Sequence, residues 1–219
     1  AEQLAFDFSF FADAPTLDKA DGEYDNFLNA YLRTAVLDVM AHLVLAAPVG
    51  AFSAAIHTVP VAQDDGSWVW TYDWQHRDGV VRIILRGLPV GDVVQWELSL
   101  APGGGNEGIL WFDGTTNGDA SEGHWSFRDL DTEGYPISGE INWGVGYLEF
   151  VSRETDTDSN RLRFIDNDPN FRIEFSDGAG GGTSFIKWNE SGSGSLLVLD
   201  YNGGQEACWD EYLMKVDCQ

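Results

Sequence analysis

Residues 68–74 read WVWTYDW, and this stretch decides the fold class of the chain. The large aromatic side chains occupy alternate positions: Trp68, Trp70, Tyr72 and Trp74. Successive side chains of a strand point to opposite faces of a sheet, so this alternation predicts a strand of an antiparallel sheet with one aromatic face.

The period of two recurs along the chain after this stretch. Residues 93–100 (VVQWELSL) and 171–175 (FRIEF) alternate between apolar and polar side chains. Turn signals, such as Asn-Gly at 117–118 and Asp-Gly at 177–178, separate the apolar runs. We therefore predict a mainly β protein, an antiparallel up-and-down meander of roughly ten strands. We expect a barrel or a strongly curled sheet, because closure removes exposed strand edges.

A different period marks residues 23–47. Apolar residues such as Phe27, Tyr31 and Val39 recur at steps of three and four, and polar residues occupy the other side. This predicts one long N-terminal helix that ends at Pro48 and packs on or in the meander. Residues 51–56 are a candidate for a short second helix.

The chain is predicted to divide near residue 22. Residues 1–22 would form a strand and a polar linker, and 23–219 the helix, the meander and a tail closed by a disulfide. Four apolar residues alternate in the first segment: Leu4, Phe6, Phe8 and Phe10. A strand of this kind can complete the sheet of a neighbouring molecule, so these residues are a candidate assembly strand.

Cys208 and Cys218 are the only cysteines, and both lie near the C-terminus. Two thiols cannot close a zinc site, so the sequence predicts a disulfide between them, with two free buried thiols as the alternative. A disulfide implies an oxidising compartment. The sequence has no uninterrupted apolar run of about 18 residues, so no transmembrane segment is expected. We expect a secreted or cell-surface protein.

The charge balance limits the partners. The chain has 12 basic and 36 acidic residues, a formal net charge of −24. Such a surface repels nucleic acid phosphates and anionic lipids, so neither is an expected partner. It favours solubility, salt tolerance or loosely held cations.

Structural calcium is the one candidate cofactor. Oxygen-rich loops carry its candidate ligands, which are Asp129, Asp131, Asp156, Asp158, Asp166 and Asp168. Calcium takes about six to eight oxygen ligands from loops of this composition. None of these loops has the spacing of an EF-hand, so solvated turns are the alternative.

No catalytic motif is present in the sequence. The histidines His42, His57, His76 and His124 lack metal-binding spacing, and the GxSxG motif is absent. Carboxylates are abundant, and nine tryptophans could stack on sugars. The enzymatic hypothesis is therefore a carboxylate-dependent glycoside hydrolase, which needs two acids within about 10 Å in an open cleft. A non-enzymatic protein is the main expectation.

The aromatic row of residues 68–74 admits two interpretations. Trp68, Trp70, Tyr72 and Trp74 could pack against the helix in the core. They could instead line a roomy barrel that binds an apolar small molecule.

Three stretches, WVWTYDW (68–74), LWFDGTTNGDASEGHWSFRD (110–129) and GSGSLLVLDYNGGQEACWDEYLMKVDC (192–218), resemble a group of uncharacterised lipoprotein-like proteins. The group comes from marine and halophilic bacteria of the Bacteroidota and neighbouring phyla. Its members have an N-terminal lipobox cysteine, a helical segment, a Trp-rich meander and a C-terminal pair of cysteines. The resemblance covers roughly residues 25–219 and implies an envelope or extracellular location, but it supplies no activity. This sequence carries no lipobox cysteine.

These observations favour a non-catalytic secreted or cell-surface envelope protein that acts as a scaffold or binds an apolar ligand. The first alternative is a subunit of an extracellular filament or surface assembly that self-associates through the N-terminal strand. The glycoside hydrolase is the second alternative.

Overall fold

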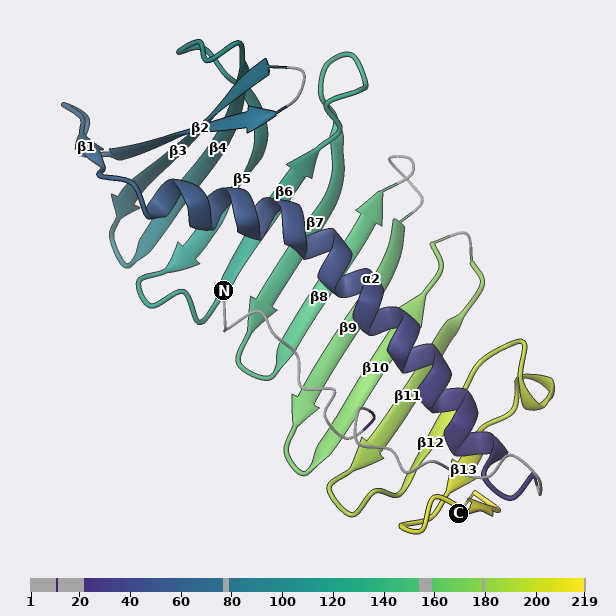
Figure 1. The fold of residues 1–219 in the computed structure, drawn as a ribbon. Coiled ribbons are helices and arrows are strands. Elements are labelled where there is room, and N and C mark those ends of the chain that lie inside the picture. The colour runs from purple at the N-terminus through teal and green to yellow at the C-terminus, as the bar shows by residue number, and fades with distance from the viewer. Residues whose placement is uncertain (1–10, 12–21, 77–78, 154–158, 179, 219) are drawn as a thin grey trace. The chain divides into compact units, whose positions relative to one another are not determined.

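The computed structural model describes residues 11, 22–76, 79–153, 159–178 and 180–218, without the side chains of 36–47 and His76. In this part of the chain, helix α2 (Asp25–Ile56) is followed by fourteen strands and the short 3-10 helix η2 (Asn202–Gly204). The strands follow one another in chain order as an antiparallel meander (Figure 1). The prediction of a mainly β antiparallel meander is therefore confirmed.

The chain divides into two compact units. Of the described residues, the first unit contains those within Val44–Val145, and the second contains Phe11 and those within 22–43 and 146–218. The strands of the first unit are β1 (Val61–Ala62), β2 (Trp68–His76), β3 (Gly79–Val90), β4 (Val93–Pro102), β5 (Ile109–Asn117), β6 (Gly123–Arg128) and β7 (Ile137–Gly144). Those of the second are β8 (Tyr147–Arg153), β9 (Ser159–Asn167), β10 (Asn170–Ser176), β11 (Thr183–Asn189), β12 (Gly194–Leu197), β13 (Ala207–Trp209) and β14 (Lys215–Val216).

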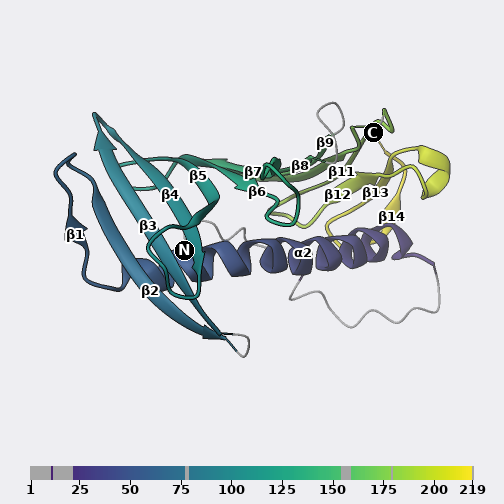
Figure 2. The same cartoon turned by 90° about the horizontal axis from the view of Figure 1, so that it is seen from above.

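In the first unit, α2 lies against one face of the sheet (Figure 2), and an aromatic cluster forms the core between them. The Phe52 ring of α2 lies 5.1 Å from the Trp96 ring and 5.6 Å from the Trp125 ring, between centroids. Trp125 also stacks on the fully buried Phe112 at 5.1 Å. Aromatic pairs at these distances add to the stabilisation that burial itself provides.

The core of the second unit is built in the same way on the N-terminal part of α2. Phe27 is buried and meets the Trp209 ring of β13 edge to face, at 6.0 Å between centroids. Phe11 stacks on Phe27 at 6.0 Å and meets Trp188 of β11 edge to face at 4.8 Å. The helix therefore covers one face of this sheet, here called the inner face.

The predicted number of strands is wrong, and so is the barrel alternative. The sheet has fourteen strands instead of roughly ten. It is unclosed, since among the described residues β1 pairs only with β2 and β14 only with β13, and the alternative of a strongly curled sheet stays a prediction. β1 and β14 have two residues each and β13 has three, so these strands are too short to show an alternating pattern.

The predicted end of the helix is also wrong. α2 extends over 32 residues to Ile56 and contains Pro48. Residues 51–56 therefore belong to α2 and are not a separate helix. A proline inside a helix costs one backbone hydrogen bond. Pro48, Phe52 and Ala55 recur at helical spacing, with Pro48 and Ala55 buried, and this packing offsets the loss.

The predicted disulfide between Cys208 and Cys218 is confirmed. It joins β13 to the C-terminal tail that carries β14. Among the described residues, no helix is long and apolar enough to cross a membrane.

Candidate functional site

The second unit contains a groove of about 770 Å³ between α2, the strands β10 and β11, and the segment that follows β12. It is lined by Asn29, Leu32, Arg33, Ile173, Phe175, Ser184, Phe185, Ile186, Val198, Leu199 and Asp200. Seven of these residues are apolar. Three of the apolar side chains remain largely exposed: Leu32 (59%), Phe175 (43%) and Leu199 (66%).

The sequence of α2 and β10 explains which side chains meet in the groove. Asn29, Leu32 and Arg33 are three and four positions apart, so they lie on one side of α2. Ile173 and Phe175 are two positions apart in β10 and share one face of the strand. Phe175 lies opposite Ser184 of β11, and this small side chain leaves the space beside Phe175 unfilled.

An ion pair lies at the edge of the groove. The Arg33 Nη2 atom of α2 donates hydrogen bonds to both carboxylate oxygens of Asp200, at 2.9 and 3.0 Å. The hydrogen bond from Arg33 lowers the pKa of Asp200, and the positive charge of Arg33 adds to this effect. Asp200 is therefore ionised at neutral pH, and the pair ties α2 to the loop that follows β12.

A buried polar contact fixes α2 near the same end of the groove. The Asn26 Nδ2 atom donates to the backbone carbonyl of Cys208 at 2.7 Å, and the Tyr201 hydroxyl donates to Asn26 Oδ1 at 2.7 Å. Burial raises the pKa of Tyr201, and the charge of Asp25 raises it further. These contacts hold one wall of the groove to β13 and to the segment before η2.

The outer face of the second unit carries a ladder of ion pairs. Glu149 lies 3.4 Å from Arg161 and 3.2 Å from Arg163, and Glu174 lies 3.6 Å from Arg163 and 2.7 Å from Arg172. Each of these two carboxylates therefore has two arginine partners. The ladder therefore joins β8, β9 and β10 across this face of the sheet.

The aromatic row of β2 does not line a barrel, because the sheet is unclosed. Trp70 lies toward the core, 5.9 Å from the Trp96 ring. The other three side chains are largely exposed: Trp68 (43%), Tyr72 (37%) and Trp74 (48%). Their predicted role in ligand binding stays a prediction, and the structure places them at an edge of the first unit.

The candidate calcium ligands form turns where the structure describes them. Asp129 accepts hydrogen bonds from the amide of Asp131 and the hydroxyl of Thr132. The hydrogen bond from the Thr132 hydroxyl is the largest cause of the lowered pKa of Asp129. Asp166 accepts one from the amide of Asp168. Asp156 and Asp158 lie outside the described residues. Within the described part, no three metal-ligating side chains come together, and the calcium site stays a prediction.

Sequence reasoning missed a hydrogen-bonded group on β6 and β7. The His124 Nδ1 atom lies 2.6 Å from Asn142 Oδ1, and its Nε2 atom lies 2.9 Å from Ser126 Oγ. This order resembles a serine–histidine–amide relay. However, Ser126 is buried and stands between Asp113 and Glu140 on the neighbouring strands. These carboxylates would oppose an oxyanion at Ser126, so the group does not support acyl transfer.

The candidate assembly strand, Leu4, Phe6, Phe8 and Phe10, lies outside the described residues. Phe11, which follows it directly, is helical and buried against Phe27 and Trp188 of its own chain. Phe11 therefore contributes to the core of the second unit, and the assembly strand stays a prediction.

Comparison with known proteins gives no relative for this site. No protein-family model, no curated protein and no solved structure matches the chain. The resemblance to lipoprotein-like envelope proteins therefore stays a prediction.

Proposed function

We propose that the protein is a non-catalytic secreted or cell-surface protein that binds an apolar ligand in the groove of the second unit. The observation that carries this proposal is the groove itself. Its volume of about 770 Å³ is within the range of small-molecule sites. Three large apolar side chains on its walls, Leu32, Phe175 and Leu199, are exposed where the sheet and α2 meet.

The chemistry of the walls favours an acyl chain with one polar end. A hydrocarbon chain in the groove would cover Leu32, Phe175 and Leu199, and full burial of such a side chain stabilises by roughly 1.5–3 kcal/mol. The polar side chains of the lining are few, and Arg33 and Asp200 lie together at the rim. They would remain near the polar end of the ligand.

One further feature supports a location outside the cytoplasm. The Cys208–Cys218 disulfide is compatible with an oxidising compartment. The net charge of −24 favours solubility and disfavours binding to nucleic acid.

A fluorescent fatty acid titrated into the full chain would test the proposal. We expect saturable binding, and we expect Leu32→Gln to weaken it by roughly 10-fold or more, because the variant removes one apolar wall contact. Leu32 is exposed, so this substitution should leave the fold intact. Val59→Gln is the matched control, since Val59 is exposed in the first unit and does not line the groove. Absence of saturable binding, or an equal loss in the control, would contradict the proposal.

A further inference from the structure

The outer edge of β2 in the first unit is largely uncovered. β1 pairs with β2 at only two positions, opposite Trp68 and Val69. β2 continues to His76, so within the described residues no strand lies beside the segment 70–76 (Figure 1). An uncovered strand edge presents unpaired backbone groups that can pair with another strand.

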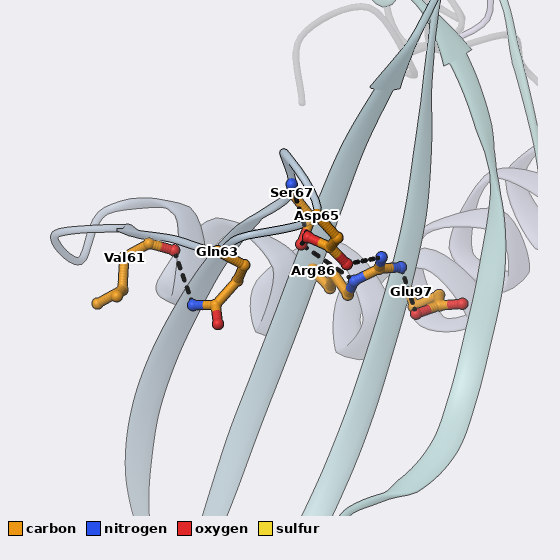
Figure 3. A network of polar contacts seen from close by, with 6 residues as sticks. All are labelled: Val61, Gln63, Asp65, Ser67, Arg86 and Glu97. Carbon is orange, nitrogen blue, oxygen red and sulfur yellow. Dashed lines mark hydrogen bonds and ion pairs between the residues drawn. The ribbon is translucent and has the colours of Figure 1, made fainter.

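A polar network fixes the turn between β1 and β2. The Asp65 carboxylate accepts hydrogen bonds from the amide and hydroxyl of Ser67, at 2.9 and 2.6 Å, and pairs with Arg86 at 2.8 Å (Figure 3). Arg86 also pairs with Glu97 of β4 at 3.2 Å. These hydrogen bonds hold the pKa of Asp65 well below its usual value, with that from the Ser67 hydroxyl the largest cause. The turn before β2 is therefore fixed to β3 and β4.

The direction of the backbone groups on this edge follows from two hydrogen bonds. The Gln63 amide donates to the Ser67 carbonyl at 2.9 Å, so the backbone groups of Ser67 point outward. Along an antiparallel strand this direction alternates, which places those of Thr71, Asp73 and Gln75 on the same outer edge. A second hydrogen bond leads to the same assignment. The Gly103 amide donates to the Val80 carbonyl, so the backbone groups of Val80 point away from β2. Val80 lies opposite Gln75, so the backbone groups of Gln75 point to the outer edge.

The side chains of this edge are suited to a partner that is uncharged and aromatic. Trp68, Tyr72 and Trp74 are exposed on one face of β2. On the other face, Asp73 is the one acidic residue of the strand, and both of its carboxylate oxygens accept hydrogen bonds from Arg82, at 2.7 and 3.1 Å. The edge is therefore close to neutral in a chain whose net charge is −24. Exposed apolar patches of this kind mark interaction sites.

We propose that two copies of the chain associate through antiparallel pairing of their β2 edges, with the two-fold axis at Tyr72. In this register Trp70 lies opposite Trp74 of the second copy, and Thr71 lies opposite Asp73. Outward-pointing residues then meet outward-pointing residues and exchange backbone hydrogen bonds. Aromatic side chains meet aromatic side chains on one face, which stabilises antiparallel pairs.

The sequence of β2 favours a second copy over an unrelated strand, because the edge is complementary to itself. A two-fold axis requires one surface to match its own copy. An axis at Asp73 would place two carboxylates directly opposite each other, which is destabilising. An axis at Tyr72 avoids this contact. The charge of each copy opposes association at long range, so the dimer should be tighter when salt screens it.

Sedimentation equilibrium of the full chain tests the pairing. We expect a dimer that strengthens as NaCl rises from about 0.05 M to about 0.5 M. Thr71→Pro removes an outward amide that the β2–β3 ladder does not use, and proline is tolerated on such an edge. We expect this variant to be monomeric with unchanged circular dichroism, and Thr71→Val, which keeps the amide, to remain dimeric. A monomeric wild type at high salt, or a dimeric Thr71→Pro, would overturn the proposal.

Cross-linking tests the register. At a two-fold axis, Tyr72 forms a non-hydrogen-bonded pair with itself, at a Cα separation of about 4.5 Å. This separation suits a disulfide. The native cysteines are bonded to each other, so a thiol introduced by Tyr72→Cys is the only free one. We expect oxidation to cross-link Tyr72→Cys, but not Gln75→Cys, which lies three residues from the axis. Cross-linking of Gln75→Cys, or of neither variant, would overturn the register.

Discussion

The side-chain amide of Asn26 in α2 donates a hydrogen bond to the backbone carbonyl of Cys208 in β13, at 2.7 Å and across 182 residues of sequence. The same amide accepts a hydrogen bond from the Tyr201 hydroxyl. Asn26 is only 2% exposed. A single buried side chain therefore connects α2 with two segments of the C-terminal part of the second unit.

Replacement of Asn26 should destabilise this unit. Asn26→Ala leaves the Cys208 carbonyl and the Tyr201 hydroxyl without their partner, and a buried unpaired polar group costs about 1–3 kcal/mol. We expect the free energy of unfolding in urea to fall by about that amount. Asn29→Ala is the matched control, because the Asn29 amide makes an exposed contact with the Asp25 carbonyl. An equal loss of unfolding free energy in the two variants would show that the buried hydrogen bonds of Asn26 do not stabilise the unit.

The raised pKa of Tyr201 predicts a loss of stability at alkaline pH. Burial favours the neutral phenol in the folded state, so the pKa lies above its ordinary value of 10.0. Below pH 10 the stabilising contribution of the buried phenol is fully present. As pH rises, the unfolded state releases the Tyr201 proton before the folded state does, so the contribution is lost as pH passes through the folded pKa. We expect wild type to lose more stability than Tyr201→Phe between about pH 9 and about pH 11. Unfolding curves with parallel pH dependence would contradict this expectation.

Strand periodicity predicted much of the sheet but not its edges. The alternation over 68–74, 93–100 and 171–175 corresponds to β2, β4 and β10. The same alternation does not reveal where a sheet ends, because closure depends on curvature and on which strands meet. β1 and β14, the two edge strands, have two residues each and so carry no periodic signal.

The sequence predicts the helix and the strands that line the groove, but it does not predict the groove. Leu32 belongs to the wide apolar stripe of the predicted helix, and that stripe gives no sign of which part the sheet leaves uncovered. The small Ser184 opposite Phe175 creates the space, and this pairing depends on the β10–β11 register. The same is true of His124 and Asn142, which are 18 residues apart and meet only through the β6–β7 register.

Glu206 predicts a loss of stability at acidic pH. The Ser195 hydroxyl donates to Glu206 Oε1 at 2.7 Å, and the Lys187 ammonium lies 2.9 Å from the same atom. The hydrogen bond from Ser195, followed by that from Lys187, lowers the pKa of Glu206 below its ordinary value of 4.5. The stabilising contribution is therefore present above pH 4.5 and is lost as pH falls through the lowered folded pKa.

Glu206→Gln should remove this dependence. We expect wild type to be more stable than Glu206→Gln at neutral pH and the difference to shrink in acid, measured by urea unfolding at several pH values. Glu211→Gln, at an exposed glutamate of the same unit, is the control and should leave the acid dependence of wild type unchanged. A difference between wild type and Glu206→Gln that stays constant with pH would show that the carboxylate contributes nothing through its ionisation.

Glycines that face tryptophans set the close packing of the first unit. Gly114 of β5 lies between Trp96 of β4 and Trp125 of β6 in the sheet register. A Cβ atom at Gly114 would collide with the His124 carbonyl and the Trp125 indole. The glycine therefore lets a large indole lie against the backbone of the neighbouring strand, a close approach that any side chain prevents.

Gly114→Ala should lower the free energy of unfolding by about 1–3 kcal/mol or more, because the backbone of β6 cannot move aside without disturbing its ladder. Gly118→Ala is the matched control in the turn after β5, where an added Cβ meets no atom within 4 Å. We expect it to change stability by less than about 0.5 kcal/mol. Urea unfolding followed by circular dichroism and by the summed tryptophan fluorescence would measure both. Equal stability of the two variants would show that β5 and β6 accommodate the added methyl group, and that the close approach at Gly114 is not needed for the packing of Trp125.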